Sequence, residues 1–207
     1  MSQTARPASA RQQELLERAY VYVLDQGLAG LSLRPLATAI GSSPRVLLFL
    51  FGSKEGLTKA LLARARSDEL EFLARTRALA QDVGERGDLT AAVRATWQWL
   101  SAEPTRPLLK LWFEAYAHSL IEPEGPWADF ARQTVEDWLE LLAEAQFPDL
   151  TTATATAERT LALAVLRGAL LDLLATGDLA RVSAAIEHYL RLVAPRQHQP
   201  STPGPDS

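Results

Sequence analysis

The residues of this chain that could do chemistry are few, and they are not grouped as an enzyme would group them. The 207-residue sequence has no cysteine, and its three histidines, His118, His188 and His198, lie far apart. Acidic residues such as Glu136 and Glu140 recur at helical spacing, which is typical of a solvated helix face rather than of paired catalytic acids. No phosphate-binding glycine loop and no nucleophile elbow occurs. The sequence therefore predicts no enzyme, no metal site and no cofactor.

A second group of polar residues is suited to contacts with nucleic acid. Ser32, Arg34, Arg45 and Lys54 fall within a short, otherwise largely apolar stretch, residues 32–57. Hydroxyl, lysine and arginine side chains bind phosphate oxygens, and arginine also pairs bidentately with the edge of guanine. This stretch is the first candidate for a functional surface.

The distribution of charge agrees with that interpretation. Residues 1–66 contain nine Arg or Lys and four Asp or Glu, a net charge of +5, whereas the remaining residues contain 12 and 21, a net charge of −9. A basic head on an acidic body is typical of a protein that meets phosphates at one end only. Chance clustering of charge is the alternative.

Two short helices around a tight turn are expected to position these side chains. Gly41 follows the apolar Ile40 directly, and glycine tolerates the positive φ that is common just past a helix end. Residues typical of helix starts precede each helix of the stretch: Ser32 with Pro35, Ser43 with Pro44, and Ser53. A helix, a glycine turn and a second helix form the helix-turn-helix pattern, whose second helix enters the DNA major groove. A helical corner in an ordinary all-α domain is the alternative.

The same stretch resembles the helix-turn-helix of the TetR family of one-component transcriptional regulators. The resemblance covers roughly the first third of the chain and rests on these positions: Gly27, Leu31 to Arg34, Leu36, Ala37, Gly41, Ser43 and Phe51 to Leu57. Leu48 and Leu50 depart from the family pattern, because they occupy places where the family commonly has a tyrosine and a histidine that touch phosphates. We expect this change to weaken DNA binding or to shift it onto other groups.

The resemblance and the side-chain chemistry together give the candidate DNA-binding residues: Ser32, Arg34, Ser43, Pro44, Arg45, Val46, Leu48, Phe49, Leu50 and Lys54. Arg34 and Arg45 are expected to reach base edges, while Ser32 and Lys54 hold phosphates. Apolar side chains of the second helix can meet thymine methyl groups.

The rest of the chain also reads as helical, so the predicted fold class is all-α, with about nine helices. We expect a disordered tail over residues 1–8 and a TetR-type helix-turn-helix DNA-binding domain over 9–68. A helical effector-binding and dimerisation domain follows over 69–194, and a second disordered tail over 195–207. Helices are expected at about 9–26, 54–79, 89–102, 127–145 and 151–175, with a further helix from residue 179.

All five tryptophans fall in the larger, C-terminal region, together with other aromatic residues. Aromatic side chains around an apolar cavity are typical of a small-molecule site, and plain core packing is the alternative. The candidate effector-binding residues are Trp97, Trp112, Phe113, Tyr116, His118, Trp127, Phe130 and Trp138. Glu114 and Gln98 are further polar candidates. The expected effector is an apolar or aromatic, weakly polar small molecule.

The helix expected at 151–175 has two apolar stripes, so both sides of it need to be covered. One cover would be the chain's own core, and the other could be the same helix of a second copy. The resemblance likewise implies a homodimer built from the last two long helices. The candidate interface residues are Leu161, Val165, Gly168, Leu171, Val182, Ile186 and Tyr189. A helix at the centre of a monomeric bundle is the alternative.

These observations predict a dimeric, sequence-specific transcriptional regulator that binds a near-palindromic site on double-stranded DNA. We expect a repressor that a small apolar effector releases. The alternative is a helical ligand-binding or protein-interaction module whose head has lost DNA binding. The polar N-terminus lacks the apolar core of a signal peptide, and no run reaches the ~18 apolar residues that span a bilayer. A cytoplasmic protein with no membrane partner is therefore expected.

Overall fold

The computed structural model describes residues 9–28, 30–82, 89–122, 124–146 and 153–194, and within these ranges every regular element is helical. The elements are α1 (Ala10–Gln26), α2 (Leu33–Ala39), α3 (Pro44–Phe51), α4 (Lys54–Asp82), α5 (Leu89–Ser101), a 3₁₀ helix η1 (Glu103–Thr105), α6 (Arg106–Ile121), α7 (Phe130–Glu144), α8 (Ala153–Thr176) and α9 (Leu179–Val193). The all-α prediction is confirmed. The tails expected over residues 1–8 and 195–207 lie outside the described residues.

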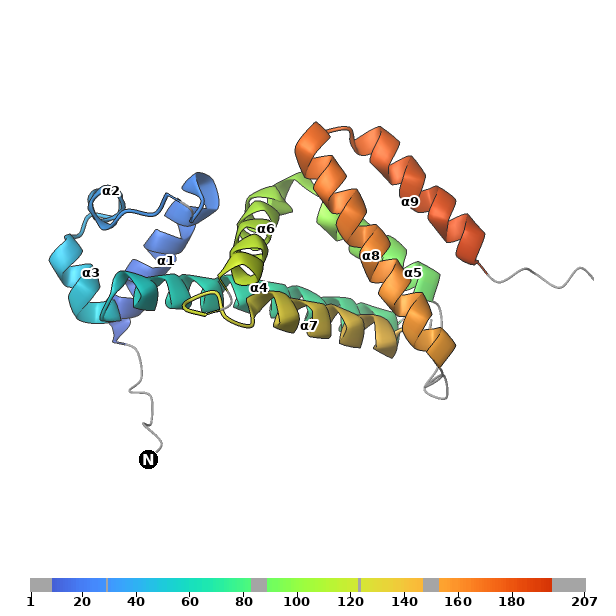
Figure 1. Ribbon diagram of the computed structural model, residues 1–207, viewed down its shortest axis with the longest axis horizontal. Helices are drawn as coiled ribbons and strands as arrows, with labels where there is room; N and C mark the ends of the chain where they lie inside the picture. The colour runs from blue at the N-terminus through green and yellow to red at the C-terminus, as the bar shows by residue number, and fades with distance from the viewer. Residues whose placement is uncertain (1–8, 29, 83–88, 123, 147–152, 195–207) are drawn as a thin grey trace, which may run out of the picture.

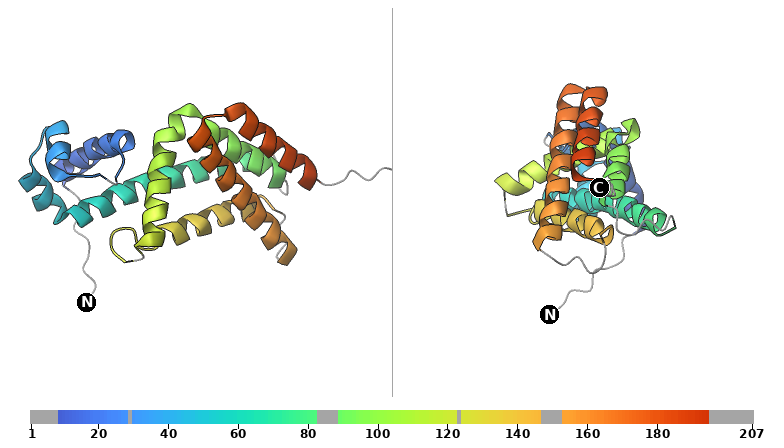
Figure 2. Two further views of the ribbon diagram at one scale, coloured as in Figure 1. Left: turned by 45° about the horizontal axis from the view of Figure 1, so that its top comes forward. Right: turned by 90° about the vertical axis from the view of Figure 1, so that its right-hand side faces the viewer.

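The molecule is elongated and has a small head at one end. Figure 1 shows α1, α2 and α3 grouped at this end, while α5 to α9 form a larger body at the other. The long helix α4 runs from the head into the body, where α7 lies along it. The second view in Figure 2 shows α8 and α9 as a pair on the outer side of the body.

Serine hydroxyls begin three of the helices in the head. The Oγ atoms of Ser9, Ser43 and Ser53 accept first-turn backbone N–H groups at 3.2, 3.3 and 3.0 Å. Each bond satisfies an N–H that the helix itself leaves without a partner. Ser32 also precedes its helix, but its hydroxyl makes no capping bond, so the sequence-based expectation of a Ser32 cap is wrong.

Two element boundaries differ from those expected. Helix α4 continues to Asp82, slightly beyond the expected end near residue 79, and the domain boundary drawn at residue 68 lies inside it. Helix α7 begins at Phe130 instead of Trp127, because the preceding Asp129 has a left-handed backbone with φ of 64°. The described head and body are therefore joined by a rigid element.

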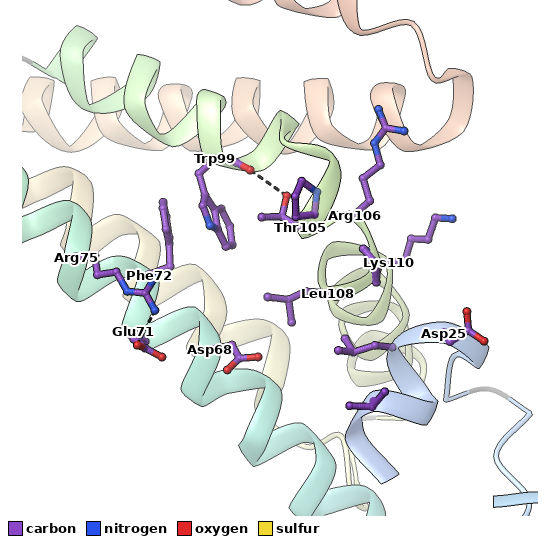
Figure 3. A pocket seen from close by; sticks show the side chains of 14 residues that line it. Asp25, Asp68, Glu71, Phe72, Arg75, Trp99, Thr105, Arg106, Leu108 and Lys110 are labelled. Carbon is purple, nitrogen blue, oxygen red and sulfur yellow. Dashed lines mark hydrogen bonds and ion pairs between the residues drawn. The ribbon is translucent and has the colours of Figure 1, made fainter. Parts of the chain in front are cut away.

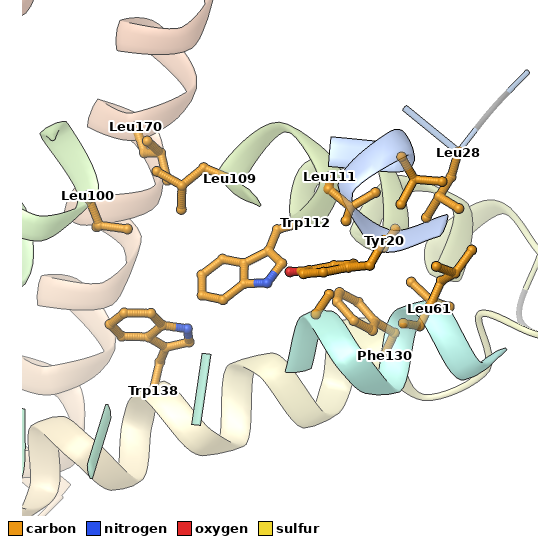
Figure 4. Close-up of a cluster of buried hydrophobic side chains, with 14 of the residues drawn as sticks. Tyr20, Leu28, Leu61, Leu100, Leu109, Leu111, Trp112, Phe130, Trp138 and Leu170 are labelled. Carbon is orange, nitrogen blue, oxygen red and sulfur yellow. The ribbon is translucent and has the colours of Figure 1, made fainter. Parts of the chain in front are cut away.

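One cluster of buried side chains extends through both the head and the body. In Figure 4, Tyr20 and Leu61 of the head lie close to Leu111 and Phe130 of the body, and the cluster continues to Trp138. The head is consequently packed against the body, chiefly where α1 meets α6.

No helix among the described residues is long and apolar enough to cross a membrane. No group of three or more His, Cys, Asp or Glu side chains in the same residues could hold a metal ion.

Candidate functional site

Helix α3 presents one side to the core of the head and the other to solvent. Leu47 is fully buried and anchors the helix, while Arg45, Val46 and Leu48 are exposed. Phe49 is 85% exposed, and together with Val46 and Leu48 it makes the solvent-facing side of α3 largely apolar. The exposed side of α3 is the side that a recognition helix presents to DNA.

Helix α1 fixes the position of α3 and of the preceding turn. The amide nitrogen of Gln12 donates to the carbonyl oxygen of Leu50 at 3.0 Å, and Arg18 donates to the carbonyl oxygen of Ile40 at 3.3 Å. Leu50 is therefore only partly exposed and packs against the core. Of the two leucines that replace the polar residues of the family pattern, Leu48 is the one at the surface.

Cationic side chains surround the exposed side of α3. Arg34, Arg45 and Lys54 are all exposed, and the described residues provide no ion-pair partner for any of them. Ser32 is exposed as well, and its hydroxyl is not used in capping. Lys54 begins α4, whose free first-turn N–H groups add positive potential. These groups remain available for phosphate and base contacts.

A polar network joins α1 to α4 inside the head. The hydroxyl of Tyr20 donates to Asp68 at 2.8 Å, and Arg64 donates to Glu17 at 2.9 Å and also to Asp68. Burial, together with the hydrogen bond to Asp68, raises the pKa of Tyr20 far above its usual value, so the phenol stays protonated. The network holds α1 on the helix that leads into the body.

A cavity of about 530 Å³ lies in the body, among α5, α6, α7 and α8. Apolar and aromatic side chains dominate its lining, with Glu114 and Arg167 as the charged members. The lining consists of Thr96, Leu100, Trp112, Phe113, Glu114, Tyr116, Ala117, Leu120, Phe130, Thr134, Trp138, Leu163, Leu166, Arg167, Leu170 and Leu171. A concave apolar space with few polar groups is the usual form of a small-molecule site.

A second hollow, of about 550 Å³, lies where α1, α4 and α6 meet (Figure 3). Its floor is the stacked pair Phe72 and Trp99, whose ring centroids are 3.7 Å apart. Its walls carry six charged side chains: Asp25, Asp68, Glu71, Arg75, Arg106 and Lys110. Because so charged a wall stays hydrated, the cavity among α5 to α8 is the better candidate for an apolar effector.

The structure brings together five of the eight predicted effector-binding residues. Those that line the α5–α8 cavity are Trp112, Phe113, Tyr116, Phe130 and Trp138. Trp97 does not, because its indole N–H donates to Ser183 of α9 at 3.0 Å. His118 and Trp127 stack on each other, with their ring centroids 4.5 Å apart, and neither belongs to the cavity lining. Gln98 is exposed and does not line it either.

Sequence reasoning missed the wall that α8 supplies. Leu163, Leu166 and Leu170 of α8 line the cavity, and they lie on the apolar stripe of this helix that does not carry the candidate interface residues. Thr96 and Thr134 also line the cavity, and their buried hydroxyls have no hydrogen-bond partner. The presence of two apolar stripes on one helix was the sequence signal that could have indicated this wall, because the buried stripe must face another apolar surface of the same chain.

The buried carboxyl group of Glu69, on α4, lies against the cavity wall. Its Oε1 accepts the indole N–H of Trp138 at 2.7 Å, while its Oε2 has no hydrogen-bond partner. Burial raises the pKa of Glu69 to about 7, although the Trp138 hydrogen bond and the nearby Arg66 act in the opposite direction. The side chain of Arg66 pairs with Asp137 of α7 at 2.6 Å. Both contacts join α4 to α7.

The two apolar stripes of α8 have different environments. One stripe is buried in the core, while Leu161 and Leu171 of the other are 53% and 51% exposed and Gly168 is also exposed. The predicted interface residues Val182 and Ile186 are buried in the chain's own core, because the apolar stripe of α9 packs against α5 and α8. We therefore remove these two from the candidate interface. The remaining candidates, Val165 and Tyr189, are partly exposed.

A helix-turn-helix head with an exposed recognition helix, rigidly joined to a helical body with an apolar cavity, defines the class of one-component transcriptional regulators. No protein-family model matches the chain. One curated relative does: the HTH-type transcriptional regulator BetI 2 of Chromohalobacter salexigens is 25% identical over 113 residues, which are 55% of this chain. The chain thus matches about half the length of this relative (54%).

Solved structures match over nearly the whole described fold. The multidrug binding protein EbrR in complex with ethidium is 26% identical, has a TM-score of 0.64, and the match covers 88% of this chain and 98% of EbrR. EbrR in complex with proflavin is 25% identical with a TM-score of 0.63, and the match covers 88% of this chain and 99% of EbrR. A TetR-family regulator from Rhodococcus sp. is 18% identical, with a TM-score of 0.63 and 89% and 99% covered. These similarities confirm the resemblance to the TetR family, and the chain has the TetR all-α fold. The relatives named here are regulators and a multidrug-binding protein rather than enzymes.

Proposed function

We propose that this protein is a homodimeric, sequence-specific DNA-binding transcriptional regulator, and that it acts as a repressor released by a small aromatic effector. The observation that carries the proposal is the exposed side of α3, where Phe49 is 85% exposed, together with the exposed cations of the head that have no ion-pair partner among the described residues. The proposal keeps the cytoplasmic localisation predicted from the sequence, where the operator DNA would lie.

In the proposed complex, α3 enters the major groove. Arg45 pairs with guanine and Arg34 reaches a base edge from α2, while Ser32 and Lys54 hold phosphates. Val46, Leu48 and Phe49 meet thymine methyl groups, which is contact that apolar side chains can make in the major groove. Ser43 and Pro44 begin the helix beside the backbone, and Leu50 contributes through its packing rather than through DNA contact.

The proposed dimer forms through the exposed stripe of α8 and the neighbouring surface of α9. Leu161, Val165, Gly168 and Leu171 form the α8 part, and an apolar face of this extent on an outer helix pair favours an isologous contact with a second copy. Two such heads would place their recognition helices about 34–36 Å apart, one turn of DNA, on a near-palindromic operator.

The proposed effector occupies the cavity among α5 to α8. Its volume of about 530 Å³ and its aromatic lining suit a planar molecule of drug-like size. The two EbrR complexes named above, with ethidium and with proflavin, support this class of ligand. Occupation of the cavity would tilt α4, change the separation of the two heads and lower the affinity for the operator, because an effector favours the state that it binds more tightly.

A second function is favoured by one observation. Leu48 is exposed at a place where the family pattern has a group that binds phosphate, and the neighbouring Phe49 is exposed as well. The head could therefore present an apolar surface to a protein instead of DNA. In that case the chain would be a ligand-binding or protein-interaction module without DNA affinity.

Selection from a random pool of duplex DNA separates the two functions. The full chain is incubated with the pool at low salt, and the retained duplexes are sequenced and tested by gel shift across a salt series. The regulator proposal expects a near-palindromic sequence whose half-sites lie about one DNA turn apart, and an affinity that falls steeply with salt. Failure to retain any duplex at low salt would overturn the proposal in favour of the second function.

A further inference from the structure

The side chain of Glu114, on α6, connects the cavity with the DNA-binding head. Glu114 belongs to the cavity lining, and its Oε2 accepts the backbone N–H of Leu28 at 2.8 Å. Leu28 directly follows the end of α1 and begins the connection to α2. A movement of this carboxylate would therefore change contacts both with a ligand in the cavity and with the backbone of the head.

The second oxygen of the same carboxylate is unused. Glu114 Oε1 is buried and has no hydrogen-bond partner, and a buried acceptor without a donor is unfavourable. Other side chains that line the cavity also have a buried polar atom without a hydrogen-bond partner: the hydroxyls of Thr96 and Thr134, the indole N–H of Trp112 and Nη2 of Arg167. Among these, Oε1 is the acceptor that carries negative charge, so it is where a cationic donor would gain most.

The contact between Glu114 and the head is close. Gly27 has φ of 78°, and a Cβ atom placed there would lie 3.1 Å from Oε2 of Glu114. The absence of a side chain at Gly27 therefore lets the carboxylate sit against the backbone at the end of α1. A carboxylate drawn toward the cavity would have to move away from this backbone, and the Leu28 N–H would lose its acceptor.

We propose that Glu114 detects the effector: an aromatic cation with an N–H donor binds Oε1 from the cavity, draws the carboxylate away from the Leu28 N–H, and loosens α1 from α6. This inference rests on the effector cavity of the proposed function and adds the chemical class of the ligand and the route to the head. A neutral donor is not sufficient, because it would have to compete with a bond that already joins the carboxylate to a backbone N–H, and ionised partners form the stronger hydrogen bonds.

Arg167 sets the orientation of the ligand. Its guanidinium lies over the ring of Tyr116, 5.5 Å from the centroid, and it lines the same cavity from α8. A cationic group would be repelled by Arg167 and attracted by Glu114. Arg167 has no hydrogen bond to the head among the described contacts, which makes it the matched control for Glu114.

Hydrogen exchange at the Leu28 amide tests the inference without DNA. The full chain is studied by NMR with proflavine, a planar cation with amino N–H groups, and with acridine, the same ring system without amino groups and uncharged at pH 8. Proflavine is expected to speed Leu28 exchange at least tenfold in the wild type, since the hydrogen bond that it breaks is charge-assisted, and acridine is expected to leave it unchanged.

Variants separate sensing from binding. In Glu114→Ala the Leu28 amide should exchange rapidly with or without proflavine. In Glu114→Gln the amide oxygen still accepts the Leu28 N–H, so exchange should stay slow, and proflavine should bind at least tenfold more weakly. In Arg167→Gln proflavine should still speed Leu28 exchange.

The inference is overturned if proflavine fails to bind the wild type, if it binds Glu114→Gln as tightly as the wild type, or if it binds without changing Leu28 exchange. Its failure is separable from failure of the proposed function. A chain that selects an operator but shows no Leu28 response would refute only the role of Glu114. A chain with the Leu28 response that retains no duplex would refute only the DNA-binding proposal.

Discussion

Replacement of Glu69 by glutamine should stabilise the protein at alkaline pH. The carboxyl group of Glu69 is fully buried, and burial raises its pKa to about 7 in the folded protein, against 4.5 for an ordinary glutamate. The folded state therefore holds this proton more tightly than the unfolded state. The contribution of Glu69 to stability is greatest below pH 4.5 and is lost as the pH rises toward 7, where a charge must be buried.

The pKa values give the size of the effect. A difference of 2.5 units between the folded and unfolded states corresponds to about 3 kcal/mol once both states are ionised. Glutamine keeps the oxygen that accepts the Trp138 N–H and cannot ionise. The free energy of unfolding of Glu69→Gln should thus exceed that of the wild type by about 3 kcal/mol at pH 8.5, and by less than about 1 kcal/mol at pH 5.

Urea denaturation of both proteins across this pH range measures the difference. Glu55→Gln is the control, because Glu55 is an exposed carboxylate on the same helix. The difference in unfolding free energy between this variant and the wild type should not grow from pH 5 to pH 8.5. A gap for Glu69→Gln that is independent of pH, or a variant less stable than the wild type at pH 8.5, would refute the burial of this charge as the cause.

The remaining predictions concern DNA binding, assembly and the cavity. Arg45→Ala should cost about 1–3 kcal/mol of DNA affinity and relax specificity at one base pair, whereas Lys54→Ala should weaken binding to all sequences alike and lower its salt dependence. Fluorescence anisotropy with matched and mismatched operators measures both effects. If neither variant changes binding, α3 is not the recognition helix. Gly168→Glu should convert a dimer into the 22.7 kDa chain in light scattering, because it places a charge in an apolar contact, and an unchanged mass would exclude this face. Proflavine should quench tryptophan fluorescence, and Trp112→Phe should reduce the quenching if Trp112 lines the occupied cavity.

The head could be predicted almost residue by residue, because local signals determine it. Ser43, Gly41 and Ser53 act through bonds and backbone angles within a few residues, so their effects are visible in the sequence. Ser32 is the exception, since whether its hydroxyl caps α2 depends on a rotamer that the neighbouring sequence does not determine.

The cavity was harder to predict, because its walls come from distant segments. The sequence shows that aromatic residues gather between 97 and 138, but not which of them face a common space. Trp97 turns to Ser183 and Trp127 to His118, and both contacts depend on how the helices cross. Val182 and Ile186 illustrate the same limit: a strong apolar stripe on α9 indicates burial but not whether the cover is the chain's own core or a second copy.

The continuity of α4 has a consequence for how precisely the proposed dimer could discriminate between two arrangements of its heads. Its 29 residues give a rod about 43 Å long at about 1.5 Å per residue. A rotation of only about 5° at the body end displaces the other end by about 4 Å, which is more than the length of one base-pair step. A linker at residue 68 would have absorbed such a rotation. An unbroken helix transmits it, so in the proposed DNA complex a rotation of a few degrees in the body is enough to move α3 by about one base-pair step.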